Sequence, residues 1–371
     1  MLLPIMMLLS AMPTFETFNA AGYGDTKVSG VWYGAGEAAD GIPLGGLGTG
    51  YLELNSDGRF GTTTMENDWL QPRPVTPGSG FVIKVGDKTL DLTDPATKVE
   101  SKMWGHWPAA DLEFANFKTG DGESVDVSLR AFSPVIPHQE VTSGRPVVLF
   151  HFRLAYTTPG SGSAKDFAVA LRWKPKEGLD AAQPLQQDSK QFGYGGVMLP
   201  VKGGSYAVGA LGGSAVVAPD GALEATVKGR LSSTEPIECT LALVWDFPEW
   251  TSSDGEILRH YYTQNLNNAG HALCTVLHQA PQWEQEVADW QRQIYASDVP
   301  PALKDACING LYVLAKNSWW LDDGRFFQSE SFTGCAITET FVCRFYGSFP
   351  LAVLWPELEK ATMKEVAKNQ A

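Results

Sequence analysis

Residues 125–132 read VDVSLRAF and alternate between apolar and polar side chains. The polar members, Asp126, Ser128 and Arg130, fall singly between apolar residues. Successive side chains of a β-strand point to opposite faces, so this pattern predicts a strand with one face in a core and the other in water.

Eight further stretches between Lys27 and Phe247 have the same β-type composition. Two pairs of them are joined by Asp57-Gly58 and by Gly86-Asp87, which favours hairpins. Clusters of Gly, Pro, Ser and Asp separate the others. The stretches are VSGVWY, YLELN, RFGTTT, FVIKV, KTLDL, PVVLFHFRLA, FAVALRW and ECTLALVWDF. Together they predict an antiparallel β-sandwich domain over residues 25–280.

The composition limits the classes of partner. The chain has 371 residues, enough for two domains, and 44% of them are hydrophobic. It carries 28 basic and 42 acidic residues, which gives a net charge of −14. Such a surface repels phosphate groups, so neither nucleic acid nor an anionic membrane surface is an expected partner. The 12 Trp and 11 Tyr offer flat apolar faces, which suit sugars as well as core packing.

Thiol and imidazole side chains are scattered along the chain. The five Cys are odd in number, so they predict no disulfide framework. The closest pair, Cys335 and Cys343, lacks the spacing of a zinc knuckle, and the six His are dispersed. The sequence therefore predicts neither a metal site nor a cofactor.

Residues 1–24 begin with the apolar run MLLPIMMLLSAMP. No Lys or Arg precedes the run, and it is too short to span a membrane, so a signal peptide and stable membrane insertion are both disfavoured. An apolar leader, a disordered start and an arbitrary start inside a longer reading frame all fit. The compartment is left open, with the cytoplasm slightly favoured.

After Pro248 the hydrophobic period changes from that of strands to that of helices. Trp283, Val287 and Trp290 recur on one helical face, with charged residues between them. We expect residues 281–371 to form a linker helix and the first helices of a second domain.

A second helix is expected to begin near residue 300. Asp298 is a suitable capping residue, with Pro300 and Pro301 in the first turn. Its apolar stripe would consist of Leu303, Cys307, Leu311 and Leu314. Further helices are expected from the apolar run over residues 340–354 and from the PELE segment that follows it.

Residues 319–356 join aromatic side chains, a turn and an isolated acid in WWLDDGRFFQSESFTGCAITETFVCRFYGSFPLAVLWP. Glu330 lies between Phe327 and Phe332, with no basic residue nearer than Arg325. A carboxylate in apolar surroundings loses hydration, so its charge must be compensated or its pKa rises. Enzymes place catalytic carboxylates in this way, although a lone Glu beside aromatic residues also serves as an ordinary helix-initiating residue.

Residues 41–50 read GIPLGGLGTG and contain a G-x-G-x-G pattern. A dinucleotide fingerprint needs a strand, this loop and then a helix, but the strand-like YLELN follows here, so a phosphate-binding loop is rejected. The alternative is a tight turn where backbone segments pack closely.

Three blocks of the chain resemble glycoside hydrolase family 116, which includes non-lysosomal glucosylceramidases and β-glucosidases. The blocks are residues 41–50, residues 105–109 with VDVSLRAFSPVIPHQ, and the surroundings of Glu330 with the FYGSF and LWPELE runs after it. The resemblance implies an N-terminal β-sandwich followed by a catalytic (α/α)6 barrel. It covers residues 30–365, so only the first barrel helices are expected, and we expect the chain to be a fragment.

The resemblance also implies roles for individual residues. Glu330 is expected to be the nucleophile of a retaining β-glycosidase. Phe341 stands where many members have a sugar-binding Asp, so Glu339, Thr340 and Arg344 are candidate substrate-binding residues, each equally suited to a packing or surface role. The family's acid/base Asp aligns beyond the last residue, so this chain alone is expected to hydrolyse ordinary glycosides poorly.

Two functions are left open at this point. The first is a β-glycosidase, acting on β-glucosides, in which Glu330 forms a covalent glycosyl-enzyme. The second is a non-catalytic carbohydrate-binding or interaction module, in which the β-sandwich is the functional part. No spacing in the chain supports a dehydrogenase or a metalloenzyme.

Overall fold

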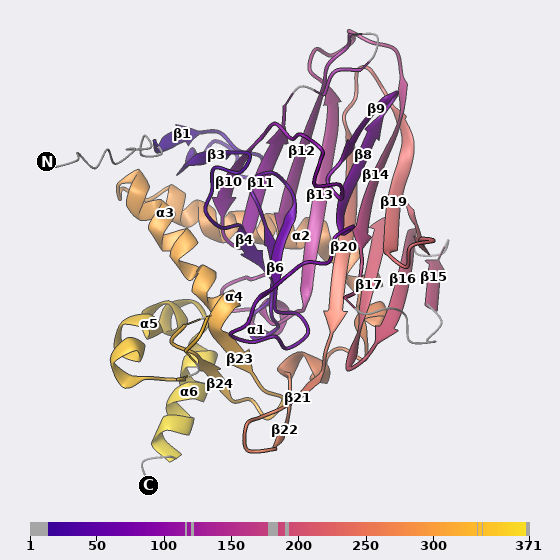
Figure 1. Cartoon of the computed structure of the whole chain (residues 1–371). Helices are drawn as coiled ribbons and strands as arrows, with labels where there is room; N and C mark the ends of the chain where they lie inside the picture. Colours follow the sequence, from indigo (N-terminus) through magenta and orange to yellow (C-terminus); the bar gives the residue numbers. More distant parts are fainter. Residues whose placement is uncertain are drawn as a thin grey trace, which may run out of the picture.

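The computed structural model describes residues 14–115, 117–119, 122–176, 185–189, 193–331, 333–335 and 337–368. Two antiparallel sheets packed face to face form its centre (Figure 1). The larger has nine strands, which are in spatial order β15 (Leu185–Ser189), β16 (Tyr194–Val201), β17 (Gly204–Leu211), β20 (Ile237–Asp246), β13 (Val147–Tyr156), β12 (Val125–Phe132), β11 (Ala109–Phe114), β10 (Ser101–His106) and β3 (Trp32–Gly34).

The smaller sheet closes one face of the larger one. Its five strands are β18 (Ser214–Val217), β19 (Leu223–Leu231), β14 (Lys165–Trp173), β8 (Gly80–Val85) and β9 (Lys88–Asp91). Leu129 and Phe150 from the larger sheet pack with Phe81 and Leu171 from the smaller, and all four are fully buried. The predicted alternation in β12 is confirmed, because Val125, Val127 and Leu129 are buried in this core.

The eight other predicted stretches also form strands, and both predicted hairpins are present. The first hairpin belongs to a four-stranded sheet of β4 (Ile42–Leu44), β5 (Leu52–Leu54), β6 (Phe60–Thr63) and β7 (Arg73–Pro74). The mainly antiparallel β architecture expected from the sequence is therefore confirmed.

The segment from residue 14 to residue 24 packs on the sandwich. Strand β1 (Glu16–Phe18) pairs with β2 (Val28–Gly30), and the Tyr23 ring is almost fully buried. Residues 1–13 of the expected leader lie outside the described residues.

Helix α2 (Ala269–Tyr295) covers part of the outer face of the larger sheet. Leu273 and Leu277 lie against Gly209, where a Cβ atom would stand 3.1 Å from each side chain. Trp283, Val287 and Trp290 are buried, as the helical period predicts. The expected domain limit at residue 280 falls inside this helix. The shorter elements before it are α1 (Glu140–Ser143), β21 (Glu249–Thr251), β22 (Ile257–Arg259) and η1 (Tyr261–Gln264).

The C-terminal part forms a small helical layer with its own core. Its elements are α3 (Pro301–Asn309), η2 (Gly310–Tyr312), α4 (Val313–Asn317), β23 (Ser318–Trp320), β24 (Phe326–Gln328), α5 (Phe341–Leu354) and α6 (Pro356–Lys368). The predicted helices over residues 340–354 and from the PELE segment are confirmed. None of the described helices is both long and apolar enough to cross a membrane.

Two details of the predicted helix near residue 300 are wrong. The helix begins at Pro301, with Pro300 rather than Asp298 at the N-cap, because a residue that precedes proline is held extended. The predicted stripe is wrong in its first half, since Leu303 is 54% exposed and Cys307 is also exposed, and Ile308 is buried against β2 instead. Its second half is confirmed, because Leu311 and Leu314 are buried.

Candidate functional site

Glu330 lies at the end of an extended two-stranded ladder. Strands β23 and β24 pair antiparallel, and Ser329, which follows β24, forms an isolated antiparallel bridge with Thr338. The Glu330 backbone N–H donates to the Ile337 carbonyl at 2.9 Å. The backbone that carries Glu330 is therefore held by hydrogen bonds from Ser329 to Asn317 and from Glu330 to Ile337.

The Asp-Asp-Gly segment makes the turn between these two strands, as the sequence predicts. The Leu321 N–H donates to the Arg325 carbonyl at 2.9 Å, and Gly324 adopts a φ of +91°, which favours glycine. The Asp323 carboxylate accepts from the Arg325 side chain at 2.7 Å and from its backbone N–H at 3.0 Å. Asp323 therefore stabilises the turn.

The Glu330 side chain is exposed. The Cys335 thiol donates to its Oε2 at 3.5 Å. The aromatic residues before it turn away, since Phe326 is buried beneath α6 and Phe327 stacks on a neighbouring tryptophan. Phe332 lies outside the described residues. The prediction that this carboxylate is desolvated is therefore wrong for the described residues. The reason is that Phe326 and Phe327 pack against other parts of the chain and not against Glu330.

Glu339 and Arg344 are in contact with each other at the start of α5. Arg344 is buried, and its Nε lies 3.3 Å from Glu339 Oε2. The same guanidinium pairs with Glu359 of α6 and donates to Gln328 Oε1 at 3.0 Å. Burial raises the pKa of Glu339 although Arg344 opposes the shift. These contacts tie β24, α5 and α6 together.

Thr340 occupies the N-cap position of α5. Its hydroxyl caps no backbone N–H, and the buried Oγ1 has no hydrogen-bond partner among the residues described. A buried hydroxyl without a partner carries a free-energy cost, so this atom is suited to an added donor or acceptor. The Phe341 side chain, which follows, lies outside the described part of the chain.

The GIPLGGLGTG segment docks directly on the strand that leads to Glu330. The Gly48 N–H donates to Ser318 Oγ at 2.8 Å, and the Gly48 carbonyl accepts from His260 Nδ1 at 2.8 Å. A Cβ at Gly48 would lie 2.6 Å from the backbone nitrogen of Trp320, and Gly48 has a φ of +70°. The prediction of a tight turn with close backbone packing is confirmed.

A buried ion pair also joins the four-stranded sheet, which contains β5, to helix α4. Lys316 Nζ lies 2.8 Å from Glu53 Oε1, and both side chains are less than a tenth exposed. The second carboxylate oxygen accepts from the Thr62 hydroxyl at 2.6 Å. Asn317, the next residue, donates to the Ser329 carbonyl at 3.1 Å and accepts from the Ser329 N–H at 3.0 Å. Lys316 is thus followed by a residue that is hydrogen-bonded to Ser329, which immediately precedes Glu330.

Half-buried aromatic rings pack beside the hairpin of β23 and β24. Trp319 lies between Trp69, with ring centroids 3.9 Å apart, and Phe327, at 5.7 Å. Trp250 of β21 approaches Trp319 at 5.2 Å. We call these four residues the aromatic column. Because Trp319 packs against three other rings, we interpret the column as packing rather than as an open stacking platform.

His260 joins the column to the glycine-rich segment. It is fully enclosed, and its Nε2 lies 2.7 Å from Asn67 Oδ1. Burial lowers the pKa of His260 to about 3. His260 is therefore neutral at physiological pH.

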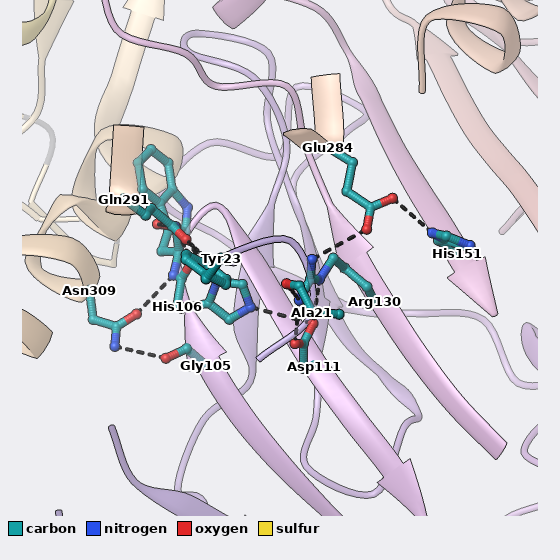
Figure 2. A network of polar contacts seen from close by, with 11 residues as sticks. Ala21, Tyr23, Gly105, His106, Asp111, Arg130, His151, Glu284, Gln291 and Asn309 are labelled. Atoms are coloured by element: carbon teal, nitrogen blue, oxygen red, sulfur yellow. Dashed lines mark hydrogen bonds and ion pairs between the residues drawn. The ribbon is translucent and has the colours of Figure 1, made fainter. Parts of the chain in front are cut away.

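A second polar network, shown in Figure 2, fixes α2 to the larger sheet. Arg130 donates twice to Asp111, at 2.7 Å each, and once to Glu284 of α2 at 3.3 Å. Glu284 also accepts from His151 Nδ1 at 2.8 Å. Although burial opposes it, the Arg130 guanidinium holds the pKa of Asp111 below its usual value.

Sequence reasoning missed most of these contacts. Glu53 and Lys316 are 263 positions apart, and neither lies in a recognisable motif. The only available signal was a lysine inside an apolar helical run. No group of three or more metal-binding side chains is found among the described residues.

Part of the chain matches the model of a known protein family. Residues 41–193 match the family model described as "beta-glucosidase 2, glycosyl-hydrolase family 116 N-term". Solved structures with some similarity include a bacterial glucoamylase complexed with acarbose, at 8% identity and a TM-score of 0.40 over 82% of this chain and 43% of that one. Another is a protein assigned as a kojibiose phosphorylase from the human microbiome, at 8% identity and a TM-score of 0.39 over 78% of this chain and 36% of that one. The chain spans less than half the length of either.

Proposed function

We propose, from the match of residues 41–193 to the N-terminal domain model of glycosyl-hydrolase family 116, that this protein is a retaining β-glycosidase acting on β-glucosides. In this proposal the sandwich supports a catalytic (α/α)6 barrel that begins with α3–α6. The observation that carries the proposal is the direct contact between the matched segment and the hairpin that ends at Glu330, through Gly48 and Ser318.

Glu330 is the nucleophile in this proposal. Its carboxylate attacks the anomeric carbon while the bond to the aglycone oxygen breaks, and a general acid protonates that oxygen. Water then attacks the glycosyl-enzyme, which releases the sugar and restores the carboxylate. The hydrogen-bonded ladder around Glu330 supports this role, because a nucleophile must be held in a fixed position.

The acid/base residue is not assigned to any position in residues 1–371. The two carboxyl groups of a retaining glycosidase stand roughly 5–5.5 Å apart, and the nearby Asp323 is engaged with Arg325 in the turn. We infer that the exposed side of Glu330 is the side on which the acid/base residue and the sugar approach it.

Thr340, Glu339 and Arg344 are proposed to bind sugar hydroxyls beside Glu330. Thr340 Oγ1, which has no hydrogen-bond partner in the described part of the chain, is the atom best suited to a direct hydrogen bond. Arg344 and Glu339 are engaged with each other, so their proposed contribution is to hold the start of α5 in place and to offer their remaining hydrogen-bonding capacity.

The stereochemistry of hydrolysis tests this function. The protein, expressed from its complete gene, is given 2,4-dinitrophenyl β-glucoside, whose good leaving group reduces the need for a general acid. Proton NMR should show β-glucose as the first product. Glu330→Gln should lower the rate by at least about 10³-fold, whereas the matched change Glu357→Gln on the exposed face of α6 should leave it unchanged. An α-anomer as first product, or an unaffected rate in Glu330→Gln, would refute the proposal.

The exposure of Glu330 favours a second function, a non-catalytic carbohydrate-binding module built on the sandwich. This function predicts sugar binding that Glu330→Gln does not alter, together with no hydrolysis of the activated glucoside. The NMR experiment above therefore separates the two functions.

A further inference from the structure

The outer face of the larger sheet carries a row of polar side chains beyond the part that α2 covers. Lys102, Glu113, Ser128, Arg153 and Glu238 lie directly opposite one another across five adjacent strands, from β10 to β20. All five have solvent-accessible side chains. Such a row places hydrogen-bonding groups about 4.8 Å apart across the sheet, because that is the spacing of neighbouring strands.

The row borders a hollow, which we call the sheet groove. The hollow has a volume of about 890 Å³, and a second one of about 230 Å³ shares Glu113, Ser128 and Arg153 in its lining. Its lining includes small side chains such as Ala35 and Ser101 and apolar ones such as Phe114. Volumes of this size are typical of small-molecule and oligomer sites.

The charges of the sheet groove limit its ligand. Three acids and three bases line it, namely Glu100, Glu113, Asp126, Lys102, Lys118 and Arg153. A polyanion or a polycation would meet like charges, and an apolar ligand would desolvate the charged groups without compensation. A neutral polyhydroxyl ligand fits both signs, because each hydroxyl can accept from a cation and donate to a carboxylate.

One end of the groove supplies an apolar surface. Trp32 and the buried Trp104 line the smaller hollow, and Trp32 is half-buried. Lys102 Nζ lies 4.6 Å from the centroid of the Trp32 ring. Lys102 covers this face of the indole, so the ammonium group meets a ligand there and can bind a sugar hydroxyl, while the exposed part of the ring supplies apolar contact.

We infer that the sheet groove binds a neutral β-linked gluco-oligosaccharide, at a site separate from Glu330. The restriction to neutral polyhydroxyl ligands follows from the lining residues. The choice of a β-linked glucan among them rests on the proposed function. Such a site would hold a polymeric substrate on the protein without taking part in bond cleavage.

Titration calorimetry and amide NMR with cellotetraose test this inference. We expect saturable binding, with chemical-shift changes in β10–β13. Arg153→Ala and Lys102→Ala should each raise Kd by about tenfold, since each removes hydrogen bonds from a charged donor. Arg230→Ala, an exposed position on β19 of the other sheet, is the matched control and should bind normally. Tetragalacturonate, an anionic chain of equal length, should bind more weakly than cellotetraose.

Three results would overturn the inference. They are no saturable binding up to about 10 mM cellotetraose, an unchanged Kd in both groove variants, and equal binding of tetragalacturonate. Glu330→Gln must retain cellotetraose binding. If cellotetraose does not bind in the sheet groove but the glucoside is hydrolysed with retention, only the assignment of the groove is wrong. If the groove binds while hydrolysis fails, the β-glycosidase proposal is lost instead.

Discussion

Gly48 shows how one residue type fixes the position of the candidate catalytic strand. It needs a left-handed backbone, and its missing Cβ lets the chain approach Trp320. The sequence predicted a tight turn at residues 41–50, because a phosphate-binding loop requires a helix after the glycines and a strand follows them here. It could not predict that the partner would be a strand 270 positions away.

Gly48→Ala should therefore lower the free energy of unfolding by more than about 2 kcal/mol, through backbone strain and the clash with Trp320. Gly24→Ala is the matched control, because Gly24 has a φ of +59° and no atom near its Cβ position. It should cost only about 1 kcal/mol. Urea unfolding measures both, and equal losses in the two variants would contradict the packing role of Gly48.

Glu330 illustrates a limit of sequence reasoning at this scale. Flanking phenylalanines predicted a desolvated carboxylate, but the direction of each side chain depends on the strand and on its partners. Phe326 points into the helical core and Phe327 into the aromatic column, which leaves Glu330 exposed.

At the scale of elements, the ion pair between Glu53 of β5 and Lys316 of α4 joins the sandwich to the helical layer. Breaking a buried pair leaves an uncompensated charge, so Lys316→Met should cost about 3–5 kcal/mol of unfolding free energy. The double variant Glu53→Leu with Lys316→Met should recover much of the loss, because no charge is then stranded. Urea unfolding of the three variants in a double-mutant cycle checks this. A loss in the double variant equal to the sum of the losses in Lys316→Met and Glu53→Leu would show that the pair is not coupled.

The contact between α2 and β13 should make stability depend on pH. The groups facing His151 are Glu284 of α2, Glu238 of β20 and Arg130 of β12. Although burial opposes it, the hydrogen bond to Glu284 raises the pKa of His151 above its usual value of 6.5. The stabilisation by protonated His151 is therefore complete below about pH 6.5 and is lost as the pH rises through the folded-state pKa.

His151→Gln should accordingly lower the unfolding free energy more at pH 5.5 than at pH 9. Unfolding curves of the wild type and the variant at the two pH values give the comparison. Glu140→Gln, an acid in the first turn of α1, is a control for general charge effects. An equal or larger loss at pH 9 would show that His151 acts through its neutral form.

The strands and helices were the part of the fold most accessible from sequence. Alternation in VDVSLRAF and turn residues such as Asp57-Gly58 act locally, so β12 and the hairpin of β5 and β6 follow from the chain itself. The limits of α3 depended on the effect of consecutive prolines, which overrode the capping preference of Asp298.

At the scale of the whole molecule, the sequence predicted a β-sandwich followed by helices but not the polar side-chain pairs that attach them. The attachment is made by long-range polar contacts, such as Arg130 with Glu284 and Glu53 with Lys316. Pairings of this kind depend on the complete topology and leave no local pattern. The position of the sheet groove has the same origin, because it arises from the register of five strands.

The proposal that this molecule is a retaining glycosidase depends on a covalent bond at one side chain. The protein expressed from its complete gene is incubated with 2,4-dinitrophenyl 2-deoxy-2-fluoro-β-glucoside, which forms a glycosyl-enzyme that hydrolyses slowly, and is then analysed by intact and peptide mass spectrometry. We expect one fluoroglucosyl group per chain, attached to the peptide that contains Glu330 and absent from Glu330→Gln. An unlabelled protein, or a label on any other residue, would contradict the assignment of Glu330 as the nucleophile.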